Sequence, residues 1–272
     1  MKNVKIFSIC LILISAIIIA GGSFPDILLN IKEKVFDSEP CERERELVIM
    51  GEERKVSYFL DAFKDYTFFN GEHSGSGEII HKFSDETINV NFLGVSSSVV
   101  EEARSALSLL GPIARLEFLE DEIVEFDNAI VFFSSYDQAR DFPDWDRIEE
   151  LKSKNGTVCQ TFVFPKSIYG RSIGEIKTSY VYVNENFIRR RLSSCIRHET
   201  LHALGMLGDT RNGYPSILDT RTARVEYSEQ DLLILTGIYS NIIRPGQTKK
   251  EALNQYCTFI SGYEVKNVRG GG

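Results

Sequence analysis

Two of the four histidines in this 272-residue chain lie four positions apart, in the run His198-Glu199-Thr200-Leu201-His202. Residues four apart share one face of an α-helix, so both imidazoles can direct a nitrogen at one metal ion. Apolar residues recur around the run at helical spacing as far as Gly205, which suits a helix C-terminus. A chance match on a surface helix is the alternative, and it is disfavoured because histidine is rare in the chain. The pattern therefore predicts a helix that carries a metal site.

The glutamate inside the motif adds a chemical function to the two histidines. Zinc lowers the pKa of a bound water to about 7, and a carboxylate that accepts its proton makes hydroxide available to attack a carbonyl. Glu199 is the candidate for this base and, later in a reaction, for the acid. We therefore expect Zn²⁺ as cofactor, His198 and His202 as ligands, and the chemistry of peptide-bond hydrolysis.

The N-terminus has the layout of a secretory signal peptide. Lys2 and Lys5 precede an uncharged apolar run from Ile6 to Ala20, which is followed by two glycines at a plausible cleavage point. Residues 1–22 are therefore predicted to be a signal peptide. The uncharged stretch continues to Pro25, so an uncleaved anchor formed by residues 6–25 stays open. In both cases the rest of the chain is exported, either to the periplasm or into the medium, or stays tethered to the membrane.

Four cysteines follow this segment, and export changes how they are interpreted. An even set in an oxidising compartment indicates two disulfides, and three pairings are possible. We favour Cys159 with Cys195, which would join a central loop to the motif helix, and Cys41 with Cys257, which would join the two ends. Four free thiols are the alternative. Because no pair has CxxC spacing, zinc ligation by cysteine is not expected.

Composition limits the kinds of partner. The chain is 43% hydrophobic and 26% charged, as in ordinary globular proteins, and its formal net charge is −8. An acidic balance argues against nucleic acid, and the sequence contains neither a phosphate-binding glycine loop nor a basic groove. A protein or peptide is the partner we expect, and the sequence does not give the oligomeric state.

The pattern of apolar residues gives the order of elements in the first two thirds of the chain. Residues 23–85 are predicted to be an N-terminal connecting segment, and the main domain is expected over 86–245. Strands are predicted at 87–93, 114–118 and 129–133, with a helix over 97–110 that stops at Gly111-Pro112. Residues 141–156 are expected to form a loop.

The remaining elements surround the motif. A strand is predicted at 178–183, and its edge either pairs within the sheet or binds an extended peptide. The motif helix is expected to begin after Asn184 as its cap and to end at Gly205. Capping boxes at Ser228 and Thr248 predict two more helices, the second within a C-terminal helix and tail over 246–272. The order indicates an α/β or α+β layer.

A few other residues could serve the same site. His73 and His81 flank a glycine-rich segment and could supply a distant ligand, although exposed loop histidines are the simpler interpretation. Tyr214 or Tyr227 could donate a hydrogen bond to an oxyanion, although packed or exposed tyrosines are more common.

The run His198-Glu199-x-x-His202-x-x-Gly205 resembles the motif of the metzincin zinc peptidases. The resemblance implies an α+β fold, in which a twisted mixed sheet packs on a long helix that carries the motif and the C-terminal part is helical. It also implies a third ligand at position 208, which is glycine here. The next residue, Asp209, is the candidate because carboxylates ligate zinc. The family's methionine turn corresponds to residues 214–218, with Leu218 in the place of methionine.

A second resemblance extends over roughly residues 88–253. It is to a bacterial exported domain family of uncharacterised function, and it rests on Cys195, Glu199, Ala203-Leu204-Gly205, Asp209, Ser216-Ile217 and Arg244-Pro245-Gly246. Many members of that family carry glutamine at the second histidine, which implies that they are not catalytic. This chain retains both histidines.

Two hypotheses from different classes follow. In the first, the chain is a zinc-dependent endopeptidase that acts on proteins or peptides outside the cytoplasm, with ligands His198, His202 and Asp209 and with Glu199 as base. In the second, it is a non-catalytic module with a peptidase-like shape that binds a cell-envelope protein or peptide.

Overall fold

The computed structural model of the chain describes residues 42–43, 45–49, 52–68, 78–120, 125–151, 158–185, 191–209, 213–219 and 224–269. They belong to one compact unit, which begins at Glu42. The expected signal peptide, the anchor alternative, Cys41 and His73 lie outside the described residues. Among the described helices, none has the length and apolar character that crossing a membrane requires.

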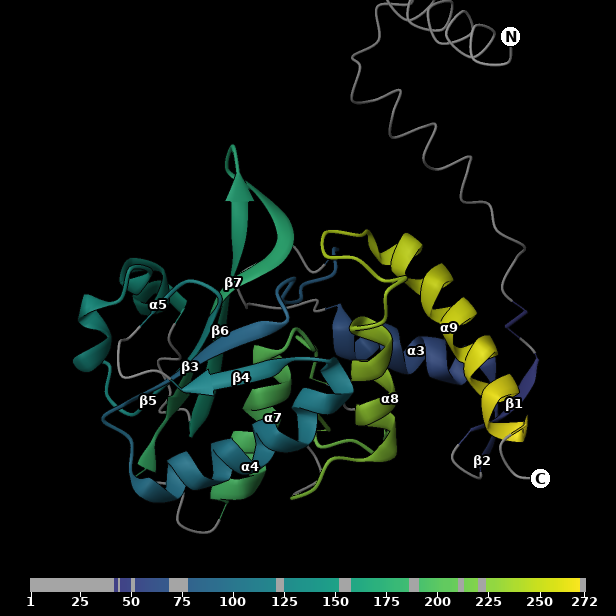
Figure 1. Cartoon of the computed structure of the whole chain (residues 1–272), viewed down its shortest axis with the longest axis horizontal. Helices are drawn as coiled ribbons and strands as arrows, with labels where there is room; N and C mark the ends of the chain where they lie inside the picture. Colours follow the sequence, from purple (N-terminus) through teal and green to yellow (C-terminus); the bar gives the residue numbers. More distant parts are fainter. Residues whose placement is uncertain are drawn as a thin grey trace, which may run out of the picture. The chain divides into compact units, whose positions relative to one another are not determined.

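A five-stranded mixed sheet organises the unit (Figure 1). The strand order is β4-β3-β5-β7-β6, and the first four strands are parallel while β6 is antiparallel to β7. Their bounds are β3 Thr87–Leu93, β4 Glu117–Glu120, β5 Ala129–Phe133, β6 Cys159–Ile168 and β7 Arg171–Val183. The expected α+β class with a mixed sheet is confirmed.

One face of the sheet carries an aromatic core. Side chains alternate between the faces of a strand, and on this face Phe162, Phe164, Tyr180 and Tyr182 are buried together. The 3₁₀ helix η1 (Gln138–Asp141) and α5 (Trp145–Leu151) lie in the same region, and Ile148 of α5 packs into the cluster. We had expected a loop over 141–156, and that prediction was wrong. The apolar residues of α5 pack against strands that are distant in sequence, so a short window did not reveal the helix.

The opposite face is covered by α4 (Ser97–Ala114) and α7 (Leu192–Ala203). Two hydroxyls of the sheet reach the backbone of α7: Thr161 Oγ1 donates to the Glu199 carbonyl at 3.0 Å, and Ser179 Oγ donates to the Ala203 carbonyl at 2.8 Å. A disulfide between Cys159 and Cys195 adds a covalent link on the same side. Helix α7 is thus attached to the sheet at residues 195, 199 and 203, one turn apart.

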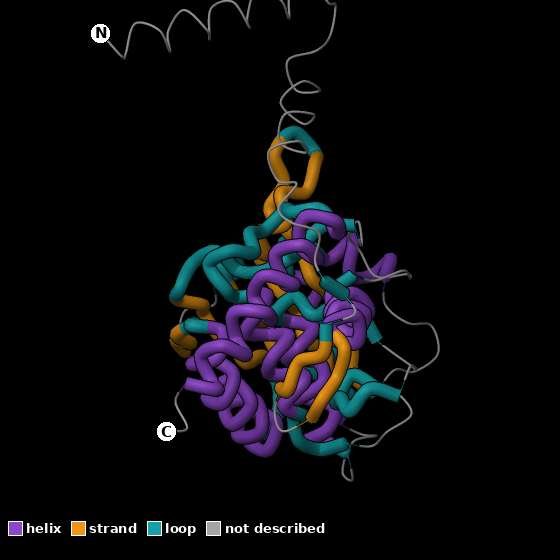
Figure 2. The backbone as a smooth tube through the Cα atoms, turned by 90° about the vertical axis from the view of Figure 1, so that its right-hand side faces the viewer, coloured by secondary structure: helices purple, strands orange, loops and turns teal. Residues whose placement is uncertain are grey.

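A helical layer stands beside the sheet. It consists of α3 (Val56–Thr67), α8 (Glu229–Ile238) and α9 (Lys249–Arg269), with the small hairpin of β1 (Glu46–Ile49) and β2 (Glu52–Lys55) next to it. The rings of Phe63 and Tyr256 stack at 4.0 Å between centroids and join α3 to α9. Figure 2 views the unit from this side, with helices and the β1–β2 hairpin in front of the sheet. Three of these elements, β1, β2 and α3, lie within the segment 23–85 that the sequence predicts to be a connecting segment.

Several predicted elements agree with the structure. Strands are present at 87–93 and 129–133, and Gly205 has the positive φ of 98° that suits the end of α7. Ser228 and Asp231 form the predicted capping box of α8. Thr248 accepts from the Glu251 N–H and its own N–H donates to the Glu251 carboxylate, so the second box is also confirmed.

Other predictions need correction. Helix α4 continues through Pro112 to Ala114, because a proline in the last turn removes a single backbone hydrogen bond while the buried face continues. The strand predicted at 114–118 therefore starts later, at Glu117. Helix α7, which carries the motif, begins at Leu192, and Arg191 before it has a non-helical backbone. Glu185, directly after the expected cap Asn184, is helical, and residues 186–190 lie outside the described residues.

Of the two alternatives for the strand predicted at 178–183, the structure shows pairing within the sheet. β7 pairs with β5 on one side and with β6 on the other, so within the sheet it is an internal strand and cannot accept a peptide.

The disulfide between Cys159 and Cys195 provides a test of how α7 is attached. In the chain-entropy relation, a link that closes 36 residues stabilises the fold by about 4 kcal/mol. Replacing both cysteines with alanine should lower the free energy of unfolding by about that amount and Tm by about 10 °C. Thermal unfolding followed by circular dichroism measures the change. A shift below 2 °C would show that the hydrogen bonds alone fix α7 to the sheet.

Candidate functional site

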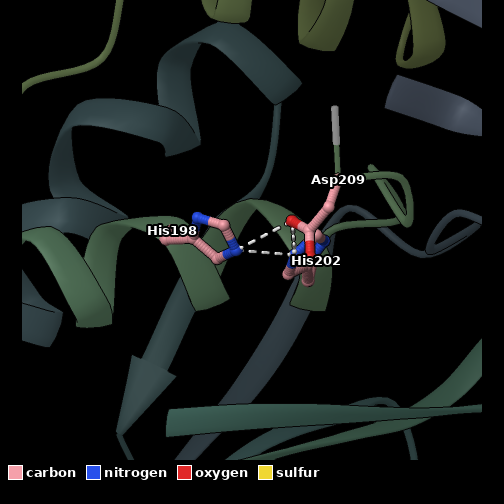
Figure 3. A group of neighbouring side chains, drawn as sticks. All are labelled: His198, His202 and Asp209. Carbon is pink, nitrogen blue, oxygen red and sulfur yellow. Dashed lines mark hydrogen bonds and ion pairs between the residues drawn. The ribbon is translucent and has the colours of Figure 1, made fainter. Parts of the chain in front are cut away.

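The two motif histidines converge on one point. His198 and His202 lie one turn apart on α7, and their Nε2 atoms are 3.0 Å from each other (Figure 3). Asp209 Oδ1 lies 3.1 Å from the Nε2 of His198 and 3.2 Å from the Nε2 of His202. The structure therefore brings together three donor atoms, one from each residue that the sequence analysis selected as a ligand.

Backbone carbonyls orient both imidazole rings from behind. His198 Nδ1 lies 3.0 Å from the Ile217 carbonyl oxygen, and His202 Nδ1 lies 2.5 Å from that of Met206. Each carbonyl accepts the proton on Nδ1, so Nε2 is the ring atom directed at the shared point. Such outer hydrogen bonds fix the tautomer and the ring orientation of metal-binding histidines.

The loop after α7 brings Asp209 to the histidines. Gly205 turns the chain with its positive φ, and the Gly208 N–H donates to the Tyr66 carbonyl of α3 at 2.9 Å. A Cβ atom on residue 208 would lie 1.9 Å from the Asp65 carbonyl oxygen, so this position requires glycine. The close contact with α3 explains why the carboxylate is at 209 and not at 208.

The distances between the donors fit a tetrahedral zinc ion. With bonds of 2.0–2.1 Å, two ligands of such an ion are about 3.3 Å apart. The three separations here are 3.0, 3.1 and 3.2 Å. Two imidazole nitrogens and one carboxylate oxygen are also a known donor set for catalytic zinc. Within the described residues, this is the group of His, Cys, Asp and Glu side chains that could hold an ion.

Without an ion, His198 and Asp209 form a hydrogen-bonded ion pair. Burial alone would lower the pKa of His198, but the hydrogen bond to Asp209 and the charges of Glu199 and Asp209 outweigh it and raise that pKa to about 9. Burial would raise the pKa of Asp209, but hydrogen bonds from both histidines hold it well below 3.8. A cation at this point is therefore favoured, and in the ion-free protein a proton supplies that charge.

Glu199 lies beside this group but outside it. Glu199 is buried, with 8% of its surface exposed, and its negative charge helps to raise the pKa of the neighbouring His198. Its backbone carbonyl accepts the hydrogen bond from Thr161, so the sheet fixes the turn of α7 that carries it.

Sequence reasoning missed two residues that support the site. Ser216 and Asp231 are both fully buried, and the Ser216 hydroxyl donates to Asp231 Oδ1. Asp231 Oδ2 also accepts from the Ile217 N–H at 3.1 Å, in the turn whose carbonyl contacts His198. Asp231 was recognised as a helix cap, but sequence alone gave no signal for its second contact. Leu218, in the place of the expected methionine, is buried in the same turn.

The other candidate residues do not belong to this group of side chains. His81 is buried and not an exposed loop residue, and it is not part of the ligand group. The Tyr227 hydroxyl donates to the Arg197 carbonyl at 3.2 Å, so it is bonded to the backbone of α7. Tyr214 packs edge-on against Tyr58 and Tyr66.

The disulfide prediction is confirmed for one pair. Cys159 and Cys195 are bonded, with 6.2 Å between their Cα atoms. Cys257 is also in a disulfide, and Cys41, its expected partner, lies outside the described residues.

Residues 57–256 match the model of a family described as protein of unknown function (DUF2927), and the chain belongs to this family. The match includes nearly all of α3, the sheet, the motif helix, α8 and the first part of α9, up to Tyr256. The resemblance to an uncharacterised domain family is thereby confirmed. A search of curated proteins finds no significant match.

The proton shared by His198 and Asp209 makes stability depend on pH. The pKa of His198 is higher in the fold than its unfolded value of 6.5, so its contribution is complete below pH 6.5 and is lost as the pH rises to about 9. In urea unfolding with chelator present, the wild type should lose stability over this range and Asp209→Asn should lose much less. Equal pH profiles would contradict the ion pair.

The close approach at Gly208 gives a second test. In Gly208→Ala the new methyl group cannot fit against α3, so the loop must shift and carry Asp209 away from the histidines. We expect zinc affinity to fall at least tenfold, measured by competition with a chelator. Gly262→Ala is the matched control, because nothing lies within 4 Å of a Cβ at that position in α9. Unchanged affinity in Gly208→Ala would show that Asp209 is not a ligand.

Proposed function

We propose that the protein is a zinc-dependent endopeptidase with a metzincin-like catalytic domain, acting on proteins or peptides outside the cytoplasm. The observation that carries the proposal is the convergence of His198 Nε2, His202 Nε2 and Asp209 Oδ1 at separations suited to zinc, with Glu199 alongside. The mixed sheet on the helix with the motif is the arrangement that the resemblance implies. The disulfide supports an oxidising compartment, where such bonds persist.

The mechanism assigns a separate task to each residue. Zinc, when bound, lowers the pKa of a water and polarises a carbonyl oxygen. His198 and His202 would hold the ion through Nε2, and the carbonyls of Ile217 and Met206 keep both rings in place. The Asp209 carboxylate would balance one of the ion's charges. Glu199 takes a proton from the attacking water and delivers it to the leaving amine, as a general base and then a general acid.

An extended peptide substrate has a candidate binding edge on β6. This strand lies at the edge of the sheet, and within the described part of the chain its outer side has no paired strand. The first half of β6 is attached to α7 at two places. Cys159 forms the disulfide with Cys195, and Thr161 donates a hydrogen bond to the Glu199 carbonyl one turn later. A peptide added there as a strand would lie next to the proposed metal site. Slower amide exchange in Cys159–Phe164 on adding peptide to an inactive variant would support this edge.

A non-catalytic module that binds a cell-envelope protein or peptide is the alternative. One feature of the ion-free site favours this alternative: Asp209 already forms hydrogen bonds with the Nε2 atoms of both histidines. Metal content of the purified exported part separates the two functions. About one zinc per chain supports the peptidase, and no zinc, even after zinc is added, supports the module.

Glu199→Gln is the decisive variant for catalysis. It removes the base while keeping the shape of the side chain, so zinc binding should remain within about threefold of wild type and cleavage of an unfolded protein should fall by 10²–10⁴. The control is Glu101→Gln, an exposed glutamate on α4, which should leave cleavage unchanged. Full activity of Glu199→Gln would reject the assigned mechanism.

A further inference from the structure

The turn at residues 216–218 connects the candidate metal site to the start of α8. Its Ile217 carbonyl oxygen lies 3.0 Å from His198 Nδ1. Inside the turn, the Leu218 N–H donates to Ser216 Oγ at 2.9 Å, which closes a tight local structure. All three residues of the turn are buried. The position of the Ile217 carbonyl therefore depends on what holds this turn.

Asp231 holds the turn from the first turn of α8. Its carboxylate accepts from the Ser216 hydroxyl and, at 3.1 Å, from the Ile217 N–H. The same carboxylate accepts from the Ser228 N–H at 2.8 Å, and the Asp231 N–H donates to the Ser228 hydroxyl at 3.1 Å. One side chain thus serves two structures: the cap of α8 on one side and the turn on the other.

The burial of Asp231 is costly for a residue that only caps a helix. Helix caps usually lie at the surface, whereas Asp231 has no exposed surface, and burial raises the pKa of its carboxyl above the usual range. A cap alone could be made with the side chain in water. The two hydrogen bonds from the turn are what the buried position adds.

We infer that Asp231 is a positioning residue for the metal ligand His198. It fixes Ser216 and Ile217, and the Ile217 carbonyl in turn fixes the His198 ring and the proton on Nδ1. The role of His198 as a metal ligand rests on the proposed function. The hydrogen bonds that link Asp231 to His198 through the turn are present in the ion-free protein, so they can be tested without metal. If Asp231 is only a cap, its loss will destabilise α8 without changing His198.

Asp231→Asn tests the inference, with Ser228→Ala as its matched control. Both variants damage the cap of α8, but only the first weakens the hold on Ser216 and Ile217. Ser216→Ala is the complementary variant, because it removes the turn's hydroxyl and leaves the cap intact. If Asp231→Asn does not fold, Ser216→Ala can still be compared with Ser228→Ala.

The first measurement uses the full exported chain without metal. In a ¹H–¹⁵N imidazole spectrum, the Nδ1 proton of His198 should be resolved and protected from exchange in the wild type and in Ser228→Ala. In Asp231→Asn and Ser216→Ala we expect exchange with water to be at least tenfold faster. Equal protection in all four proteins would overturn the inference, as would an equal loss in Ser228→Ala, which would show that helix destabilisation alone is responsible.

The second measurement is zinc affinity, by competition with a chelator. Loss of an outer hydrogen-bonding partner lowers metal affinity 10–100-fold, and we expect this for Asp231→Asn and Ser216→Ala but less than threefold for Ser228→Ala. If the wild type binds no zinc, the proposed peptidase fails, and the imidazole spectrum still decides the role of Asp231. If the wild type binds zinc and Asp231→Asn binds it equally well, the positioning role fails and the peptidase stands.

Discussion

The attachment of α7 to the sheet is the constraint on which the rest of the site depends. Residues 195, 199 and 203 occupy one stripe of the helix, and each is linked to a strand by a disulfide or by a hydroxyl that donates to a carbonyl. These links fix both the rotation of the helix and its position along its own axis. Because His198 and His202 lie on an adjacent stripe, fixing the rotation also fixes the direction in which both imidazoles point.

Local signals in the sequence predicted the parts of the structure that local physics decides. The spacing of the two histidines, the capping boxes at Ser228 and Thr248, and the strands at 87–93 and 129–133 depend on neighbours within a few residues. Helices α3 and α5 were missed because their apolar faces pack against elements far away in the sequence. The same limit applies to the strand predicted at 178–183: the sequence left open whether its edge pairs within the sheet or binds a peptide, and its pairing with β6 decides for the first.

The position of Asp209, the proposed third ligand, illustrates this limit within the site. The resemblance implied position 208, and the chain has glycine there and aspartate next. From sequence the offset could only be noted, whereas in the structure it has a cause, since residue 208 lies against the backbone of α3 and has no room for a side chain. Asp231 is similar: its place in a capping box was evident, but its contact with the turn below His198 required the tertiary fold.

The contact between Gly208 and α3 also has a consequence for the order of folding. The two histidines need only the helix that carries them, and such local structure forms early. Asp209 reaches them only after a helix near the start of the domain has docked onto a loop near its end, a contact with high loop-closure entropy. In a partly folded chain the His198, His202 and Asp209 side chains are therefore not yet together, and the three groups meet only once the fold is complete.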